Sequence, residues 1–396
     1  MLAVLRRRDF GLLWLGGLIS VAGDWVLYAA LPYFVYERTG STIATAGMIV
    51  ARLVPGFVLG TVAGVYVDRW DRKRVLVAAN LVKAAVVAGL LVVPADGFLW
   101  VVYAVAVAQS VVASFSTPAE SALLPSLVAD ADLLAANALN ALNNRVGRLI
   151  GLPVGGALLA ETGLRGVVVV DCLTFVVAAL LIAPIAAPRV QRLLADGDHA
   201  ASFWSDWRAG LRIVRHERTI AIIFVVIGLM TFGGTMLDPL TVAWVRDVLG
   251  EGPEVFAWLL TVHAATGILG TLVVGRFGVR FTPRALIGWS SLVAGAALAL
   301  RYNVPSVALA LSLSAVAGIT SVVSSVGVET LVQREIRDEY RGRVFGALGA
   351  SSALLSLLGA SVAGGLAEVV GLVPMLNVAC GLVALAGVVV LRAFTR

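Results

Sequence analysis

The chain is poor in the residues that build disulfides, metal clusters and phosphate loops. It has only 2 cysteines in 396 residues, Cys172 and Cys380, and both fall inside apolar stretches, which excludes a disulfide framework or a cysteine metal cluster. Its lysines are Lys73 and Lys83, and neither follows a glycine. The G-x-x-x-x-G-K-[ST] loop is therefore absent, which excludes ATP use by that route.

Histidine and charge are also scarce. The 3 histidines, His199, His216 and His263, are scattered, whereas a membrane enzyme would need clustered histidine and acidic residues, so we expect no enzyme and no cofactor or metal. Only 14% of residues are charged and 60% are apolar, against about 25% and 45–50% in soluble domains. The composition predicts an all-α, multi-pass protein of the cell membrane.

The long apolar stretches predict twelve transmembrane helices, since a bilayer core needs ~20 helical residues. The predicted spans are residues 10–36, 43–67, 75–94, 98–120, 134–160, 165–187, 218–245, 254–275, 285–301, 305–328, 345–369 and 372–394. With the N-terminus inside, 22 of the 30 Lys and Arg residues fall in inner segments and 4 in outer ones. This bias predicts that both termini are cytoplasmic, and it explains the net charge of +6 without nucleic acid.

The predicted organisation is two halves joined by a polar segment. Residues 1–187 form an N-terminal six-helix bundle, and residues 218–396 form a C-terminal one. Residues 188–217 are charged and carry apolar residues at helical spacing, which predicts a cytoplasmic linker with an amphipathic, interfacial helix.

The two halves resemble each other in order and spacing. Four landmarks recur at offsets of 209 to 211 residues: Gly60 with Gly270, Arg69 with Arg280, Glu120 with Glu329, and Gly155-Gly156 with Gly364-Gly365. Four matches in order indicate a duplication. Repeated halves around a central cavity are typical of secondary transporters.

The segment from Gly64 to Leu76 reads G-V-Y-V-D-R-W-D-R-K-R-V-L. It resembles the loop between helices 2 and 3 of the major facilitator superfamily, G-x-x-x-D-R-x-G-R-[RK]. The matching residues are Gly64, Asp68, Arg69, Arg72 and Lys73, whereas Asp71 replaces the usual glycine.

Other stretches are similar to the macrolide-efflux and enterobactin-exporter-like branch of this superfamily. They are Gly23-Asp24-Trp25, S-T-P-A-E-S-A-L-L-P at 116–125, A-A-N-A-L-N at 135–140, and Q-R-E-I-R-D-E-Y-R-G-R-V-F-G at 333–346. The resemblance covers essentially the whole chain. It implies a monomeric exporter of amphipathic small molecules, such as a drug, a siderophore or a lipid-like compound, driven by proton antiport through alternating access.

Span 5 adds a directional signal. Superfamily exporters often carry G-P-x-x-G-G here, and this chain has Gly151, Pro153, Gly155 and Gly156, with the proline one position late. Glycines allow close helix approach, and proline frees a carbonyl and bends the helix, so we expect a hinge. The shifted proline leaves an importer or uncoupled facilitator open, and a non-transporting sensor is a third alternative.

Ionisable residues inside a span are functional candidates because they are costly in a bilayer. Asp24 lies about 12 residues from the outer end of span 1, or roughly 18 Å deep. We expect it to face the cavity near Arg52, Arg148 or both and to couple protons to substrate. The alternative is a structural ion pair that locks helices 1, 2 and 5. Lys83 is expected to snorkel toward the cytoplasm.

The remaining membrane candidates have both functional and structural interpretations. Asp238 either lines the external exit or is satisfied near the headgroups, and for Asp171 the second interpretation is preferred. His263 either relays protons or is simply hydrogen-bonded. Trp25 and Tyr28 are candidate cavity aromatics. The asparagines that open span 5 either line the cytoplasmic opening or bond neighbouring helices.

The superfamily resemblance also implies a cytoplasmic gate. In it, Asp68, Arg72 and the acidic residue that closes span 4, here Glu120, form a charge relay that holds the inner side shut. Glu329 with Arg343 is expected to be a weaker counterpart, because Val279 stands where Asp68 stands in the first half.

Overall fold

The computed structural model describes residues 2–67, 69–92, 99–186, 217–336 and 341–393, and every regular element in these ranges is helical. Within them, 11 helical stretches are long and apolar enough to cross a membrane. The predicted all-α membrane class is therefore confirmed.

The chain divides into two compact units. One comprises Met1–Val35 and Ala51–Ala200, and the other comprises Tyr36–Val50 and Ala201–Arg396. Residues 36–50 thus group with the second unit, which differs from the simple division expected after residue 187. Apart from Glu217, the predicted linker at 188–217 lies outside the described residues.

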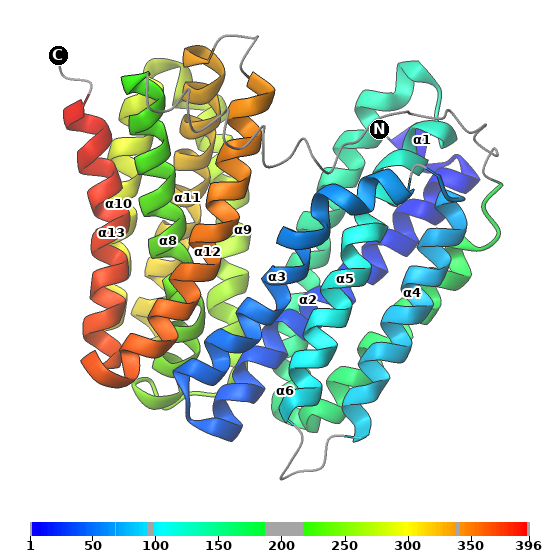
Figure 1. Cartoon of the computed structure of the whole chain (residues 1–396), viewed down its shortest axis with the longest axis horizontal. Helices are drawn as coiled ribbons and strands as arrows, with labels where there is room; N and C mark the ends of the chain where they lie inside the picture. Colours follow the sequence, from blue (N-terminus) through cyan, green and yellow to red (C-terminus); the bar gives the residue numbers. More distant parts are fainter. Residues whose placement is uncertain (1, 68, 93–98, 187–216, 337–340, 394–396) are drawn as a thin grey trace. The chain divides into compact units, whose positions relative to one another are not determined.

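Five long helices carry the first half of the chain (Figure 1). They are α2 (Arg8–Thr39), α3 (Thr42–Val67), α4 (Arg72–Ala88), α5 (Leu99–Leu123) and α6 (Leu133–Ile182), with the short elements α1 (Leu2–Leu5), η1 (Gly89–Val92), η2 (Leu124–Leu127) and η3 (Asp130–Asp132). Helix α4 packs on both α5 and α6. This arrangement brings α4 between the two helices that follow it in the chain.

Six long helices carry the second half (Figure 1). They are α8 (Arg218–Asp247), α9 (Pro253–Phe277), α10 (Pro283–Asn303), α11 (Val307–Glu335), α12 (Arg341–Val370) and α13 (Leu372–Ala393), with η4 (Gly278–Arg280) between α9 and α10. Helix α10 packs on α11 and α13, and α8 packs on α12 and α13.

Helix α6 is interrupted. Its 50 residues include Gly163 with φ 65° and ψ −167°, a non-helical conformation that favours glycine. The segments on either side, 133–162 and 164–182, are therefore separate helical rods.

Glycines set the closest helix contacts in both units. A side chain at Gly151 of α6 would overlap the carbonyl oxygen of Ala22 in α2, and one at Gly155 would overlap that of Val26. In the second unit, a side chain at Gly359 of α12 would overlap the carbonyl oxygen of Phe232 in α8. Small residues allow backbones to approach in this way in membranes.

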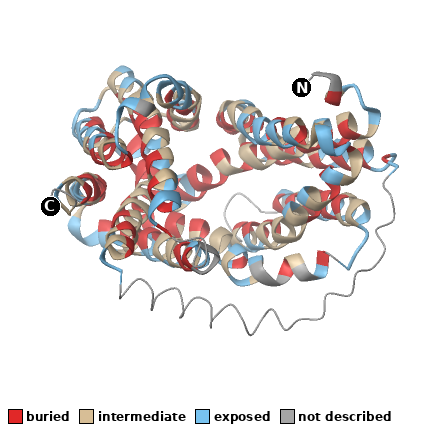
Figure 2. Cartoon of the chain, turned by 90° about the horizontal axis from the view of Figure 1, so that it is seen from above, coloured by how far each residue is buried: buried red, intermediate tan, exposed pale blue. Residues whose placement is uncertain are grey.

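Each unit has an apolar core built from corresponding sequence positions. Phe10, Leu13, Leu76 and Leu139 are buried in the first unit. Residues 209 to 211 positions later, Ile220, Ile223, Ile287 and Leu348, are buried in the second. Figure 2 shows buried segments on the helices of both units. The packing therefore repeats with the sequence and supports a duplication.

Candidate functional site

The first unit contains a cavity of about 360 Å³ lined by α2, α3, α4, α5 and α6. This volume lies within the range of small-molecule pockets, roughly 300–1,000 Å³. Its wall combines carboxylates, a lysine, an arginine, asparagines and aromatic side chains. A wall of this composition suits a molecule with both polar and apolar parts.

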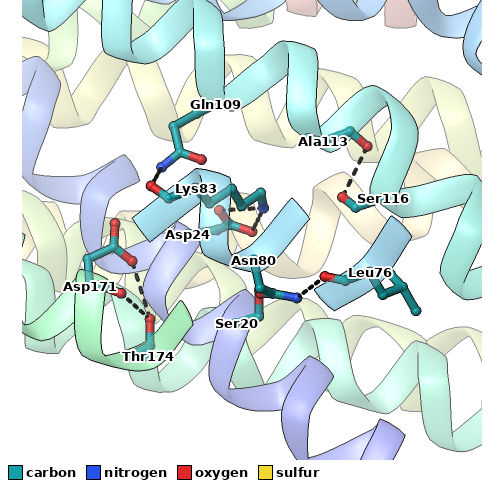
Figure 3. Close-up of polar contacts among 10 residues, drawn as sticks. All are labelled: Ser20, Asp24, Leu76, Asn80, Lys83, Gln109, Ala113, Ser116, Asp171 and Thr174. Carbon is teal, nitrogen blue, oxygen red and sulfur yellow. Dashed lines mark hydrogen bonds and ion pairs between the residues drawn. The ribbon is translucent and has the colours of Figure 1, made fainter. Parts of the chain in front are cut away.

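An ion pair between α2 and α4 occupies this wall (Figure 3). Lys83 Nζ lies 2.8 Å from Asp24 Oδ2 and 3.0 Å from Asp24 Oδ1. The side chain of Lys83 is 7% exposed, whereas that of Asp24 is 42% exposed. The carboxylate therefore opens to the cavity while the ammonium is buried behind it. The expectation that Lys83 snorkels toward the cytoplasm is wrong, because Asp24 provides an anionic partner within the bundle.

The two arginines lie on aromatic rings. The guanidinium carbon of Arg52 is 4.1 Å from the ring centre of Tyr28, and that of Arg148 is 4.7 Å from Trp25. Trp25 and Tyr28 meet edge to face with ring centres 4.9 Å apart, and both line the cavity. Asp24 and Arg52 line the same cavity, whereas the ion-pair partner of Asp24 is Lys83 and neither arginine. The alternative of an ion pair that locks helices 1, 2 and 5 is therefore wrong, and the coupling role of Asp24 stays a prediction.

Hydroxyl and amide groups extend the polar wall below the ion pair (Figure 3). Ser20 donates to Asn80 Oδ1 at 2.9 Å, and the Asn80 amide donates to the Leu76 carbonyl at 2.9 Å. Asn143 lines the cavity and also donates to the Trp14 carbonyl at 2.7 Å. For this residue the hydrogen bond to α2 agrees with the second interpretation of the span-5 asparagines, and the first stays a prediction.

Glu120 also lines the cavity. The implied pairing of Glu120 with Arg72 is not present, because the Arg72 guanidinium donates to the Ala122 carbonyl at 2.8 Å instead. Asp68 lies outside the described residues, so the gate role of this set stays a prediction.

Other residues of the basic loop between α3 and α4 form hydrogen bonds with the ends of helices. Lys73 donates to the carbonyl groups of Ala183 and Ile185, at 3.3 and 3.0 Å, beyond the last turn of α6. Asp71 caps α4 by accepting from the Arg74 amide at 3.1 Å, which gives a physical role to the residue that replaces the usual glycine. Arg69 is exposed, and Gly64 is half-buried on α3.

The other predicted residues are distributed as follows. Gly151, Gly155 and Gly156 are buried on α6 with Pro153 among them, and their hinge role stays a prediction. In the second unit, Asp238 and Glu329 are exposed, and His263 Nε2 lies 3.5 Å from Ser321 Oγ. The side chain of Arg343 lies outside the described residues.

Sequence reasoning missed the partner of Asp24. Lys83 is one of only 2 lysines and lies inside a span, which was the available signal. Sequence reasoning also preferred to interpret Asp171 as an aspartate satisfied near the headgroups, whereas the structure buries its side chain fully. Among the described residues, no group of three or more His, Cys, Asp or Glu side chains is placed to hold a metal ion.

Comparison with known families decides the identity of the fold. The family pattern described as Major Facilitator Superfamily matches residues 13–250 and 223–396. The chain belongs to this superfamily. The predicted resemblance is therefore confirmed, and the chain is a multi-pass transporter protein of the cell membrane.

Relatives within the superfamily match nearly the whole chain. Macrolide efflux protein A of Streptococcus pyogenes is 26% identical, covering 89% of this chain and 88% of the relative. Multidrug efflux pump Tap of Mycobacterium bovis is 26% identical, covering 90% and 86%. A bacterial homologue of the iron transporter ferroportin, solved in an inward-facing state, aligns with a TM-score of 0.76 at 18% identity over 98% of this chain and 99% of that one. The nucleoside transporter NupG aligns with a TM-score of 0.78 at 11% identity over the same shares. At these identities the solved structures support the fold alone.

Proposed function

We propose that this superfamily member is a secondary active exporter of amphipathic small molecules, such as a drug, a siderophore or a lipid-like compound, driven by proton antiport. Efflux-named relatives that span about nine-tenths of the chain support the direction of transport. The cavity wall supports the class of substrate, because Trp25 and Tyr28 offer apolar surface beside the charged Asp24.

The observation that carries the proposal is the unequal exposure of the Asp24–Lys83 pair. A half-exposed carboxylate on the cavity wall is reachable by both a proton and a substrate. Protonation of Asp24 removes one charge of the pair, so Lys83 loses its partner and the potential of the cavity changes. A proton and a polar or cationic substrate group then compete for the same wall, which is the linkage that antiport requires.

We propose further that the chain crosses the membrane twelve times with both termini in the cytoplasm. An unbroken α6 of 50 residues would be ~75 Å long, more than twice the bilayer core, whereas the segments on either side of Gly163 each suit one crossing. The alternating access that transport needs would then follow from movement of two repeated halves in a monomer.

Proton movement in inside-out vesicles tests this function. With the lumen acidified, macrolides, cationic dyes, siderophores and lysolipids are added one at a time, and the pH gradient is followed with a fluorescent probe. We expect at least one compound to dissipate the gradient with the wild-type protein and none to do so with Asp24→Asn. Glu335→Gln is the matched control, because it removes an exposed ion pair with Arg284 outside the cavity. Proton movement that persists in Asp24→Asn would refute the coupling role.

A further inference from the structure

Asp171, on the part of α6 that follows Gly163, is a fully buried carboxyl with few hydrogen-bond partners. Its side chain is 0% exposed, and its Oδ2 has no hydrogen-bond partner among the described residues. Its Oδ1 lies 3.4 Å from the Thr174 hydroxyl, which already donates to the Asp171 carbonyl at 2.7 Å (Figure 3). Burying a carboxylate with so few hydrogen-bond partners is costly, and this cost is smaller for a neutral carboxyl.

The backbone of α2 brings Asp171 next to the ion pair. A side chain at Gly23 would overlap Asp171 Oδ1 and Thr174 Oγ1, so α2 and the carboxyl are in close contact one residue before Asp24. On the α4 side, Cys172 Sγ donates to the Ala84 carbonyl at 3.3 Å, one residue after Lys83. The charged groups that act on Asp171 are accordingly Asp24 from α2 and Lys83 from α4. Helix α5 presents the uncharged Gln109, which donates to the Lys83 carbonyl.

Lys83 is the cation that acts on both carboxyl groups. Its ammonium is bonded to both oxygens of Asp24 and lies 5.1 Å from the ring centre of Phe175, one turn after Asp171 on the same face of α6. A lysine carries three donors on a flexible stem, so it can exchange one hydrogen-bond partner for another.

We propose that Asp171 is a second proton-binding carboxyl that exchanges its proton with Asp24, with Lys83 as the shared counter-ion. When the O–H bond of Asp171 breaks and one forms on Asp24, Lys83 turns from Asp24 to Asp171. The trio has zero net charge before and after the transfer, so no uncompensated charge is created in the membrane. This inference rests on the proposed proton antiport and adds a proton site behind the cavity wall.

Infrared difference spectroscopy on the purified, full-length protein tests the proposal without any substrate. The C=O stretch of a protonated carboxyl is resolved from that of a carboxylate, and the wild type minus Asp171→Asn spectrum isolates the Asp171 component at neutral pH. We expect this component to be present in the wild type. We expect it to be lost in Asp24→Asn, because Lys83 then needs Asp171 as its ionised partner. The Glu335→Gln control is expected to retain it.

Two results would overturn the proposal. One is a spectrum of Asp171→Asn that matches the wild type in this region, which would mean that Asp171 is ionised. The other is an Asp171 component that is unchanged in Asp24→Asn, which would mean that no exchange occurs. The second result is read from infrared spectra, so it does not require the Asp171→Asn variant to transport substrate. Failure of the antiport proposal is separate, since it would appear as absent substrate-driven proton movement in the wild type whatever the infrared result.

Discussion

Single residues in the cavity wall are stabilised by partners of different kinds. Asp24 is held by an ammonium, while Arg52 on the same wall lies on the Tyr28 ring. A guanidinium over a ring remains charged and available to a substrate anion, and the contact contributes about 0.5–2 kcal/mol. The two kinds of contact let opposite charges coexist in one wall without neutralising each other.

Replacing Lys83 by Met tests separately how much the ion pair contributes to the stability of the protein and whether proton-coupled transport needs it. The Asp24 carboxyl loses its counter-ion but is 42% exposed to the cavity, so water partly replaces the lost partner. The free energy of unfolding should fall by about 1–3 kcal/mol, less than for a fully buried pair. Thermal unfolding in detergent and substrate-driven proton flux measure the two effects. We expect the flux to be lost, and Lys83→Arg to retain more stability than Lys83→Met. A Lys83→Met protein with wild-type flux would contradict the role of the pair.

At the scale of helices, the contact between α2 and α6 positions the site. Gly151 and Gly155 let α6 approach the backbone of α2 on both sides of Trp25. This close contact holds the Trp25 ring against Arg148. The contact between α8 and α12 at Gly359 repeats this geometry in the second unit.

Gly151→Ala is expected to disturb this contact. The added methyl group would meet the Ala22 carbonyl and the Trp25 side chain, and overpacking of this kind costs about 1–3 kcal/mol. Gly60→Ala on α3 is the matched control, because nothing lies within 4 Å of the added carbon there. Alanine favours a helix over glycine by up to about 1 kcal/mol, so this control should be neutral or stabilising. Thermal unfolding of both variants makes the comparison, and equal melting temperatures would argue against a tight α2–α6 contact.

At the scale of the whole chain, the corresponding cores and glycine contacts indicate that each half folds by the same packing plan. The difference lies in the polar residues added to it. The first unit carries the ion pair and the cavity, whereas the equivalent of Asp68 in the second half is Val279.

The number of crossings can be measured with single cysteines in a Cys172→Ala, Cys380→Ala background. Glu161→Cys, Asp130→Cys and Glu217→Cys all introduce thiols at exposed positions. If α6 crosses twice, a membrane-impermeant maleimide should label Glu161→Cys from outside, and the other two only in inside-out vesicles. Labelling of all three from one side would contradict the twelve-span topology.

Sequence alone determined the membrane class, the all-helical character and the superfamily. These follow from local quantities, namely apolar runs of bilayer length and a loop motif of fixed spacing, which need no knowledge of contacts. It also placed Asp24, Trp25 and Tyr28 among the cavity candidates, because an ionisable group inside a span is rare.

Only the tertiary structure decided which of these residues meet. Spacing along a helix does not fix which neighbouring helix faces a side chain, so Asp24 was expected near Arg52 and Arg148 and its partner Lys83 was missed. The pairing of Glu120 with Arg72 was implied by the superfamily resemblance, and it too depends on contacts between helices. The burial of Asp171 likewise depends on how closely α2 approaches α6 at Gly23, which is a contact between segments about 150 residues apart. Partners in a helical bundle are set by packing between helices, and that information is not local in the sequence.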